Sequence, residues 1–355
     1  MYRGLFAFVL LLILQSSLSC KKGDTAPVTP VVVVDSFQLV QTSGLTYVAK
    51  GDSIFKGGMN GSWRGVNALH TFGVGNAAEY RALDDWKVKI VREFIGNLRE
   101  QPITGAVVFT SIGQYLHPLQ TVVDSNRAHG LITILCPFGW VDFNKTTYEF
   151  TGLNPSQQVF YAEYKSKMQL LAEQFKNQPD VWIEIWNEPY RWDNGNNYSH
   201  ELWFSDVMDM TRNLRLVSGF TNIILVPGNE QGQSENAILA KGADLLKYRN
   251  NIVFDLHAYE QWLLNSTIAQ VENRIKTLRT NHFPILFGET SVVNVSGLMP
   301  ISPFLDVVKR ENISTMAWVW KRDSTDQHAL MGASGAPNNT NNNNWGDTFK
   351  QFLSN

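Results

Sequence analysis

The feature that most constrains the fold is a repeated alternation of short apolar runs with longer helical stretches, which starts at Arg64 and continues to the C-terminus. The runs are rich in Val and Ile and recur at intervals of roughly 30 to 40 residues, a pattern typical of βα units with a parallel sheet. Eight candidate strands follow from it: 64–69, 88–94, 131–136, 181–186, 222–226, 252–257, 285–288 and 315–320.

Stretches with helical spacing lie between these runs. Eight strand–helix units in series most simply close into a single (β/α)8 TIM barrel. An open, doubly wound sheet is the alternative, but no glycine-rich phosphate loop follows the first strand to support it. The predicted helices are 77–86, 119–129, 156–176, 200–217, 235–248, 267–280, 302–310 and 348–353.

The N-terminus has the pattern of an export signal. Arg3 precedes an apolar run over 5–14, which is too short to span a bilayer because about 20 residues are needed. Leu18-Ser19-Cys20, followed by two lysines, resembles a bacterial lipoprotein signal. We therefore expect a signal peptide over 1–19, a proline-containing tether over 20–36 and a barrel domain over 37–355. The protein would be exported and lipid-anchored through Cys20 in the periplasm or at the cell surface, with plain secretion as the alternative.

The charge balance gives no reason to expect a nucleic acid or an anionic membrane surface as partner. Lys and Arg number 30 against 32 Asp and Glu, which gives a net charge of −2. A neutral partner and a monomeric state are the better expectations. A lipidated Cys20 would leave Cys136 without a disulfide partner, so the fold must depend on its core.

In such barrels, catalytic side chains lie at the C-terminal ends of the strands. Two carboxylates at the ends of different strands suit cleavage of a glycosidic bond, in which one donates a proton and the other attacks the sugar or directs water at it. A lone glutamate there would more simply be a solvated loop residue, but the two occur together among polar and aromatic neighbours. The candidate site comprises Arg92, Asn187, Glu188, His257, Tyr259, Glu289 and Trp320.

Four tryptophans lie near the ends of predicted strands. Trp140, Trp192, Trp262 and Trp320 lie at or just beyond strand ends, where they either stack on sugar rings or pack the loops. No group of His, Cys and carboxylates has convincing metal spacing; His257 with Glu260 comes nearest, and we expect no metal and no cofactor. Simple packing is expected for Trp63, Trp86, Trp182, Trp203 and Trp345.

Several motifs together resemble glycoside hydrolase family 5. The segment 183–189, Ile-Glu-Ile-Trp-Asn-Glu-Pro, is similar to the Asn-Glu-Pro signature of clan A glycoside hydrolases. Val91-Arg92, His257-Ala258-Tyr259 and the strand-eight segment 317–320 follow the family's order, and the resemblance covers 65–349. It implies a retaining enzyme with Glu188 as acid/base, Glu289 as nucleophile, Asn187 on the sugar 2-hydroxyl and Trp320 as the floor of the cleavage subsite. Glu184 has the strand parity of Glu188 but lies about 13 Å deeper, so we expect a buried partner.

One departure affects substrate preference. The family usually has a His at the end of strand three, whereas here 131–136 runs into Pro137-Phe138-Gly139-Trp140; His70, His117 or Trp140 could fill that space.

The resemblance of 323–334 to a loop of bacterial cellulases favours an endo-β-1,4-glucanase acting on β-linked polysaccharide or oligosaccharide. An endo-β-1,4-mannanase is the alternative, because Arg64-Gly65-Val66-Asn67 and His70-Thr71 also resemble mannanases of the family. Cleavage of xylan stays open. A non-catalytic polysaccharide-binding lipoprotein is the alternative from another class, but it would be expected to have lost one of the two glutamates.

Overall fold

The computed structural model describes residues 39–73, 75, 77–339 and 344–354. The predicted signal peptide, the lipidation site at Cys20 and the tether over 20–36 lie outside the described residues. Within the described part, no helix has the length and apolarity needed to cross a membrane.

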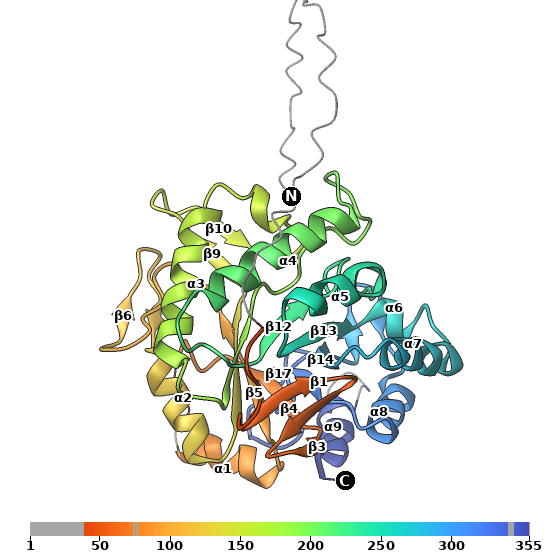
Figure 1. Cartoon of the computed structure of the whole chain (residues 1–355). Helices are drawn as coiled ribbons and strands as arrows, with labels where there is room; N and C mark the ends of the chain where they lie inside the picture. Colours follow the sequence, from red (N-terminus) through yellow and green to blue (C-terminus); the bar gives the residue numbers. More distant parts are fainter. Residues whose placement is uncertain (1–38, 74, 76, 340–343, 355) are drawn as a thin grey trace, which may run out of the picture. The chain divides into compact units, whose positions relative to one another are not determined.

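The central element is a parallel barrel with helices around it (Figure 1). The barrel is closed, and its strands follow the order β11-β12-β13-β14-β17-β4-β5-β8. The predicted (β/α)8 TIM barrel is therefore confirmed, and the open doubly wound sheet is wrong. Each strand coincides with a predicted apolar run, and no end differs by more than two residues. The strands are β4 (Arg64–Ala68), β5 (Ile90–Ile95), β8 (Ile132–Pro137), β11 (Val181–Glu184), β12 (Ile224–Pro227), β13 (Ile252–Ala258), β14 (Ile285–Thr290) and β17 (Thr315–Trp320).

Helices surround the barrel and follow the predicted stretches closely. The largest differences are at the third helix, which begins at Tyr161 after a separate 3-10 turn η1 (Pro155–Gln157), and at the last, which begins at Trp345. The helices are α1 (Ala77–Asp85), α2 (Leu119–Ala128), α3 (Tyr161–Phe175), α4 (His200–Arg215), α5 (Asn236–Tyr248), α6 (Glu260–Leu263), α7 (Ile268–Thr280), α8 (Ile301–Arg310) and α9 (Trp345–Ser354).

An N-terminal three-stranded sheet closes the bottom of the barrel. Its strands are β1 (Tyr47–Lys50), β2 (Ser53–Lys56) and β3 (Met59–Gly61). The rings of Tyr47, Trp63 and Trp182 meet edge to face at 5.6 to 5.9 Å, in one buried cluster with residues that fill the barrel interior. Apolar side chains therefore fill the N-terminal end, and polar chemistry is left to the mouth at the C-terminal end.

Three short hairpins extend the loops that follow barrel strands. They are β6 (Val108–Phe109) with β7 (Tyr115–Leu116), β9 (Gly139–Val141) with β10 (Thr147–Glu149), and β15 (Val293–Asn294) with β16 (Gly297–Leu298). Since these loops leave the C-terminal ends of β5, β8 and β14, they lie around the mouth of the barrel.

Candidate active site

Arg92 is the central cation of the site. It projects from β5 into the barrel, where its guanidinium is fully buried. Nε and Nη2 donate to the two carboxylate oxygens of Glu184 at 2.7 and 2.9 Å, Nη1 donates to Glu289 Oε1 at 2.6 Å, and Nη2 also donates to Asn187 Oδ1 at 2.8 Å. One rigid fork of donors thus fixes three of the side chains that the strands bring together.

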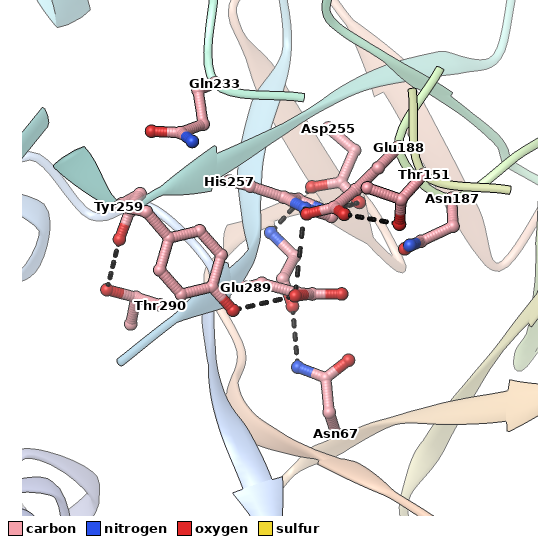
Figure 2. Close-up of polar contacts among 12 residues, drawn as sticks. Asn67, Thr151, Asn187, Glu188, Gln233, Asp255, His257, Tyr259, Glu289 and Thr290 are labelled. Carbon is pink, nitrogen blue, oxygen red and sulfur yellow. Dashed lines mark hydrogen bonds and ion pairs between the residues drawn. The ribbon is translucent and has the colours of Figure 1, made fainter. Parts of the chain in front are cut away.

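Glu289, at the end of β14, holds its carboxylate between two donors. Arg92 binds one oxygen, and the Tyr259 hydroxyl donates to Oε2 at 2.8 Å (Figure 2). Burial and the neighbouring Glu289 carboxylate raise the pKa of Tyr259 well above its usual value, so the phenol keeps the proton that it donates. Both donors stabilise negative charge on Glu289, as a carboxylate nucleophile requires.

A bulge in β14 presents Glu289 to the barrel interior. Leu256 of β13 pairs with Phe287, but the next residue, His257, pairs with Glu289, so Gly288 is an extra residue. Its N–H donates to Asp255 Oδ1 at 2.6 Å, and its carbonyl accepts from Asn67 Nδ2 at 2.8 Å. Without the extra residue, strand alternation would put Glu289 on the same outward face as Phe287.

Glu188 follows β11 and lies closer to solvent than Glu289. Its Oε1 is 2.9 Å from His257 Nδ1, and its Oε2 accepts from the Thr151 hydroxyl at 2.9 Å (Figure 2). One oxygen of Glu188, one of Glu289 and a ring nitrogen of His257 all lie within 4.8 Å of one another. The two glutamates that the sequence singled out therefore meet at the mouth, although their strands are not neighbours in the barrel.

His257 lies between the two glutamates and Asp255. Its Nδ1 is 3.8 Å from Glu289 Oε2, and its Nε2 is 3.8 Å from Asp255 Oδ2. Burial by itself would lower the pKa of His257, but the surrounding carboxylates of Glu289, Asp255 and Glu188 raise it well above its usual value. Nδ1 of His257 and Oε1 of Glu188 share a proton in one hydrogen bond, and the role of His257 in holding the network stays a prediction.

Glu184 is a buried partner, as predicted from its depth. Its side chain is fully buried, and both carboxylate oxygens are bound by Arg92. Burial raises its pKa to about 7, although the Arg92 charge opposes the shift. Glu184 thus orients the arginine from below, on the side away from the mouth.

Two groups of side chains have the proximity needed for a metal ion: Glu184 with Asp255 and His257, and Glu188 with His257 and Glu289. In each group at least one carboxylate already faces the fixed cation of Arg92. Arg92 Nη1 is 2.6 Å from Glu289, and its Nε is 2.7 Å from Glu184 and 3.7 Å from Asp255. The guanidinium provides the compensating charge that a metal would otherwise supply, so we assign these residues no metal.

Two of the candidate tryptophans do not reach the cleft. Trp140 is buried, with its ring stacked on Phe160 at 5.4 Å and an interplanar angle of 10°. Trp262 is buried under the Arg274 guanidinium, 3.5 Å from its ring centre, and donates Nε1–H to the carbonyl of Gln233. The interpretation of both as sugar platforms is wrong, because neighbouring side chains already cover the rings.

Trp320 is also placed differently from the expectation. Ala317 pairs with Val66 of β4 and Trp320 with Ala68, so three steps along β17 match two along β4. The irregularity turns Trp320 outward, where its ring packs edge to face on Trp86 at 5.1 Å and is 2 % exposed. Trp320 therefore cannot form the floor of a sugar-binding subsite. Trp318 is half-buried, and its ring is stacked on that of Phe138.

His70 does not fill the space left by the missing strand-three histidine. It is buried on the outer side of β4 and β5, with Nδ1 2.8 Å from Glu93 and Nε2 3.5 Å from Glu79. Burial by itself would lower its pKa, but these two carboxylates raise it to about 10. The residue beside Arg92 at the end of β8 is instead Phe138, whose ring centre lies 4.9 Å from the guanidinium.

The remaining sequence-based assignments have mixed outcomes. Trp192 is 64 % exposed on the loop after β11, and its stacking role stays a prediction. The packing role of Trp63, Trp86, Trp182, Trp203 and Trp345 is confirmed, because all five are buried.

Four residues of the site were not expected from the sequence: Asn67, Thr151, Asp255 and Phe138. The alternation of side chains along a strand could have identified Asn67 and Asp255, because each lies two residues from a position that faces the barrel interior. Thr151 carries no such signal, because it lies in the loop between β10 and α3 and reaches Glu188 only through the tertiary fold.

Comparison with known proteins agrees with this geometry. A family model described as cellulase (glycosyl hydrolase family 5) matches residues 50–324. No curated protein sequence matches the chain significantly.

Three solved structures illustrate the structural similarity. A β-mannanase from Thermomonospora fusca has a TM-score of 0.68 at 15% identity, over 88% of this chain and 97% of that one. An endoglucanase catalytic domain from Thermobifida fusca has a TM-score of 0.63 at 16% identity, over 87% and 97%. A β-mannanase from Streptomyces thermolilacinus has a TM-score of 0.60 at 18% identity, over 80% and 88%. Identities this low show a shared fold.

Proposed function

This chain belongs to glycosyl hydrolase family 5 and is a glycoside hydrolase, and from that premise we propose that it is a retaining endo-β-1,4-glycanase acting on β-glucan. The observation that carries the proposal is the proximity of the two glutamates, an oxygen of each lying within 4.8 Å. This proximity is nearer to the spacing of about 5 to 5.5 Å between the carboxyl groups of a retaining enzyme than to the spacing of about 6.5 to 9.5 Å in an inverting enzyme.

In the first step Glu289 attacks the anomeric carbon, and Glu188 donates its proton to the glycosidic oxygen. The bond between the anomeric carbon and the glycosidic oxygen breaks. The glycone is then an ester of Glu289, and the shortened chain leaves as an alcohol. In the second step Glu188 removes a proton from water, and the resulting oxygen attacks the anomeric carbon and displaces Glu289. Two inversions give net retention, and Glu188 regains its proton.

The surroundings of the two carboxylates support this division of roles. Glu289 is buried between the Arg92 and Tyr259 donors, which stabilise the anion that attacks. Glu188 lies at the rim, where the leaving oxygen and the water enter. Asn187 uses its amide oxygen to accept from Arg92, so its amide nitrogen is the group available to donate to the sugar 2-hydroxyl.

The decisive test uses an activated aryl glycoside with a good leaving group. Its first step needs no proton, so Glu188→Ala should still form the glycosyl-enzyme and be rescued by azide to a product of retained configuration. Glu289→Ala should be inactive, with azide giving at most the inverted product. The opposite behaviour would reverse the roles, and near-normal activity of either variant would remove that residue from the mechanism.

β-Mannan is the second candidate substrate. The Arg64–Asn67 segment resembles mannanases, and two of the structures compared above are β-mannanases. β-Glucan leads because of the cellulase-like loop over 323–334. Release of reducing ends from carboxymethylcellulose, glucomannan, galactomannan and xylan by the purified protein would rank the substrates, and activity on galactomannan alone would reject the glucanase proposal.

We also propose that the protein is an exported monomer anchored by a lipid on Cys20. The proposal rests on the Leu18-Ser19-Cys20 signal and the proline-containing tether. A labelled fatty acid should mark the wild type and not Cys20→Ser, whereas equal labelling would favour plain secretion. Gel filtration of Cys20→Ser without detergent should give the mass of a single chain, which is 40.1 kDa or less.

A further inference from the structure

The segment that carries the acid Glu188 lies beyond the sheet of the barrel. Strand β11 ends at Glu184, so residues 188–190 are not part of its ladder. Tyr190 also has a φ of 64°, which is rare for a residue with a bulky side chain and persists only where surrounding contacts impose it. The position of Glu188 therefore depends on contacts with other parts of the chain.

The loop after β10 supplies three of these contacts. The Gly152 N–H donates to the carbonyl of Glu188 at 2.7 Å, and the Tyr190 N–H donates to the carbonyl of Leu153 at 3.0 Å. From the same loop, the Thr151 hydroxyl donates to Glu188 Oε2 at 2.9 Å (Figure 2). This loop thus holds both the backbone and the carboxylate of the acid.

Asp206 connects the segment of the acid with the loop after β10. It lies on α4, where it is buried, and its Oδ2 accepts from the Tyr190 hydroxyl at 3.0 Å. Its carboxylate also accepts from the hydroxyl and the N–H of Ser156, in the η1 turn that follows this loop. Burial raises the pKa of Asp206 to about 6, although the hydrogen bonds from Ser156 and Tyr190 oppose the rise. At neutral pH the group is mainly a carboxylate, which can accept from both residues.

We propose that Asp206 and Tyr190 are positioning residues for the acid/base, and that their hydrogen bond holds Glu188 where it exchanges protons with the glycosidic oxygen and with water. The proposal rests on the glycanase function proposed above. Through Tyr190, Asp206 restrains the backbone two residues beyond Glu188. Through Ser156 it restrains the loop that binds the carbonyl and the carboxylate of Glu188.

The nucleophile is held by other groups. Glu289 accepts from Arg92 at 2.6 Å and from the Tyr259 hydroxyl at 2.8 Å. These donors come from β5 and from the end of β13, whereas Asp206 lies on a helix that surrounds the barrel. Loss of the bond between Tyr190 and Asp206 should therefore impair proton transfer by Glu188 and leave the attack by Glu289 nearly unchanged.

Two β-cellobiosides separate these steps, or two β-mannobiosides if the wild type cleaves only those. A 2,4-dinitrophenyl group leaves without a proton, whereas a phenyl group needs the proton of Glu188. Tyr190→Phe removes only the hydroxyl that donates to Asp206. It should lower kcat/KM about tenfold on the phenyl glycoside and less than about twofold on the dinitrophenyl glycoside. On the latter, kcat and KM should fall together, because Glu188 also acts as the base of the second step.

Tyr161→Phe is the matched control. The Tyr161 hydroxyl donates to Asp209 Oδ2 at 3.0 Å, so this variant also removes a hydrogen bond from a tyrosine to an aspartate of α4. It should match the wild type on both glycosides. Asp206→Ala should show the pattern of Tyr190→Phe with a larger loss on the phenyl glycoside, because it also releases Ser156.

Folding of each variant is checked by cooperative urea unfolding. Unchanged kcat/KM on the phenyl glycoside in folded Tyr190→Phe would overturn the proposal. Equal losses on the two glycosides would overturn it as well, because they would indicate a purely structural role. Tyr190→Phe changes a single hydroxyl, so it gives this answer even if Asp206→Ala does not fold. A wild type inactive on every glycoside and polysaccharide would instead reject the proposed function.

Discussion

The substitution Gly288→Ala tests how the fold presents the nucleophile. Gly288 is the extra residue of the β14 bulge that turns Glu289 inward. A Cβ at this position would lie 2.2 Å from Asp255 Oδ2 and 2.4 Å from Oδ1, far closer than carbon and oxygen atoms approach. Asp255 is fully buried near Arg92 and His257, so it cannot move away without disturbing both.

The expected loss of folding stability in Gly288→Ala has two contributions. Forcing a methyl group into a packed interior costs about 1 to 3 kcal/mol. Losing the charge-assisted hydrogen bond from Gly288 N–H to Asp255, 2.6 Å long, costs about 1.5 to 3 kcal/mol more. We expect Gly288→Ala to lower the free energy of unfolding by about 2.5 to 6 kcal/mol. A shift of about 1 Å in Glu289 should also lower kcat about 100-fold.

Urea unfolding and turnover of an activated aryl glycoside measure the two effects separately. Gly73→Ala is the control, because a Cβ at Gly73 meets nothing within 4 Å. The double variant Gly288→Ala/Asp255→Ala removes the clash, so its loss of stability should be smaller than the sum of the two single losses.

The reasoning would be refuted by a Gly288→Ala protein within about 0.5 kcal/mol of wild-type stability, the range of ordinary surface substitutions, with unchanged turnover. Strict additivity in the double variant would also show that the methyl group and the Asp255 carboxylate do not compete for space.

Three further predictions follow from the site and its surroundings. Trp320→Ala should destabilise the fold by about 3 to 5 kcal/mol, whereas Trp318→Ala should melt normally and lose kcat/KM; the reverse result would restore Trp320 to the subsite. Tyr259→Phe removes one donor to Glu289 and should lower kcat about 10- to 100-fold in a normally folded protein, and full activity would show that Arg92 suffices. His70 has a pKa of about 10 when folded and about 6.5 when unfolded, so its stabilisation is complete below pH 6.5 and is lost as the pH rises toward 10. Urea unfolding at pH 6.5 and 9.5 should show a loss on the order of 4 kcal/mol that His70→Gln largely abolishes, and equal losses in both proteins would contradict the assignment.

The sequence by itself determined the barrel, its elements and the identity of the two glutamates. Apolar runs and helical spacing are local properties of the chain, and every barrel strand lies within two residues of its expected ends. The position of Glu188 and Glu289 just past two of those runs was enough to place them at one mouth, because parallel strands in a closed barrel all end on the same side.

Burial of the loop aromatics was decided by the tertiary structure. Trp140 and Trp192 both follow strand ends, but the ring of Trp140 packs on Phe160 at the start of α3 and that of Trp192 remains exposed. Nothing near either residue in the sequence distinguishes them, since the covering side chains come from elsewhere in the chain.

The direction in which two decisive side chains point was also decided only by the tertiary structure. Simple alternation would turn Glu289 outward with Phe287 and Trp320 inward with Trp318, and both directions are reversed by irregular pairing with the neighbouring strand. Such irregularities depend on hydrogen bonds to other strands, such as that of Gly288 to Asp255 of β13. The side-chain period of a strand is local, but its register is set by its neighbours in the barrel, and one extra residue reverses every side chain beyond it.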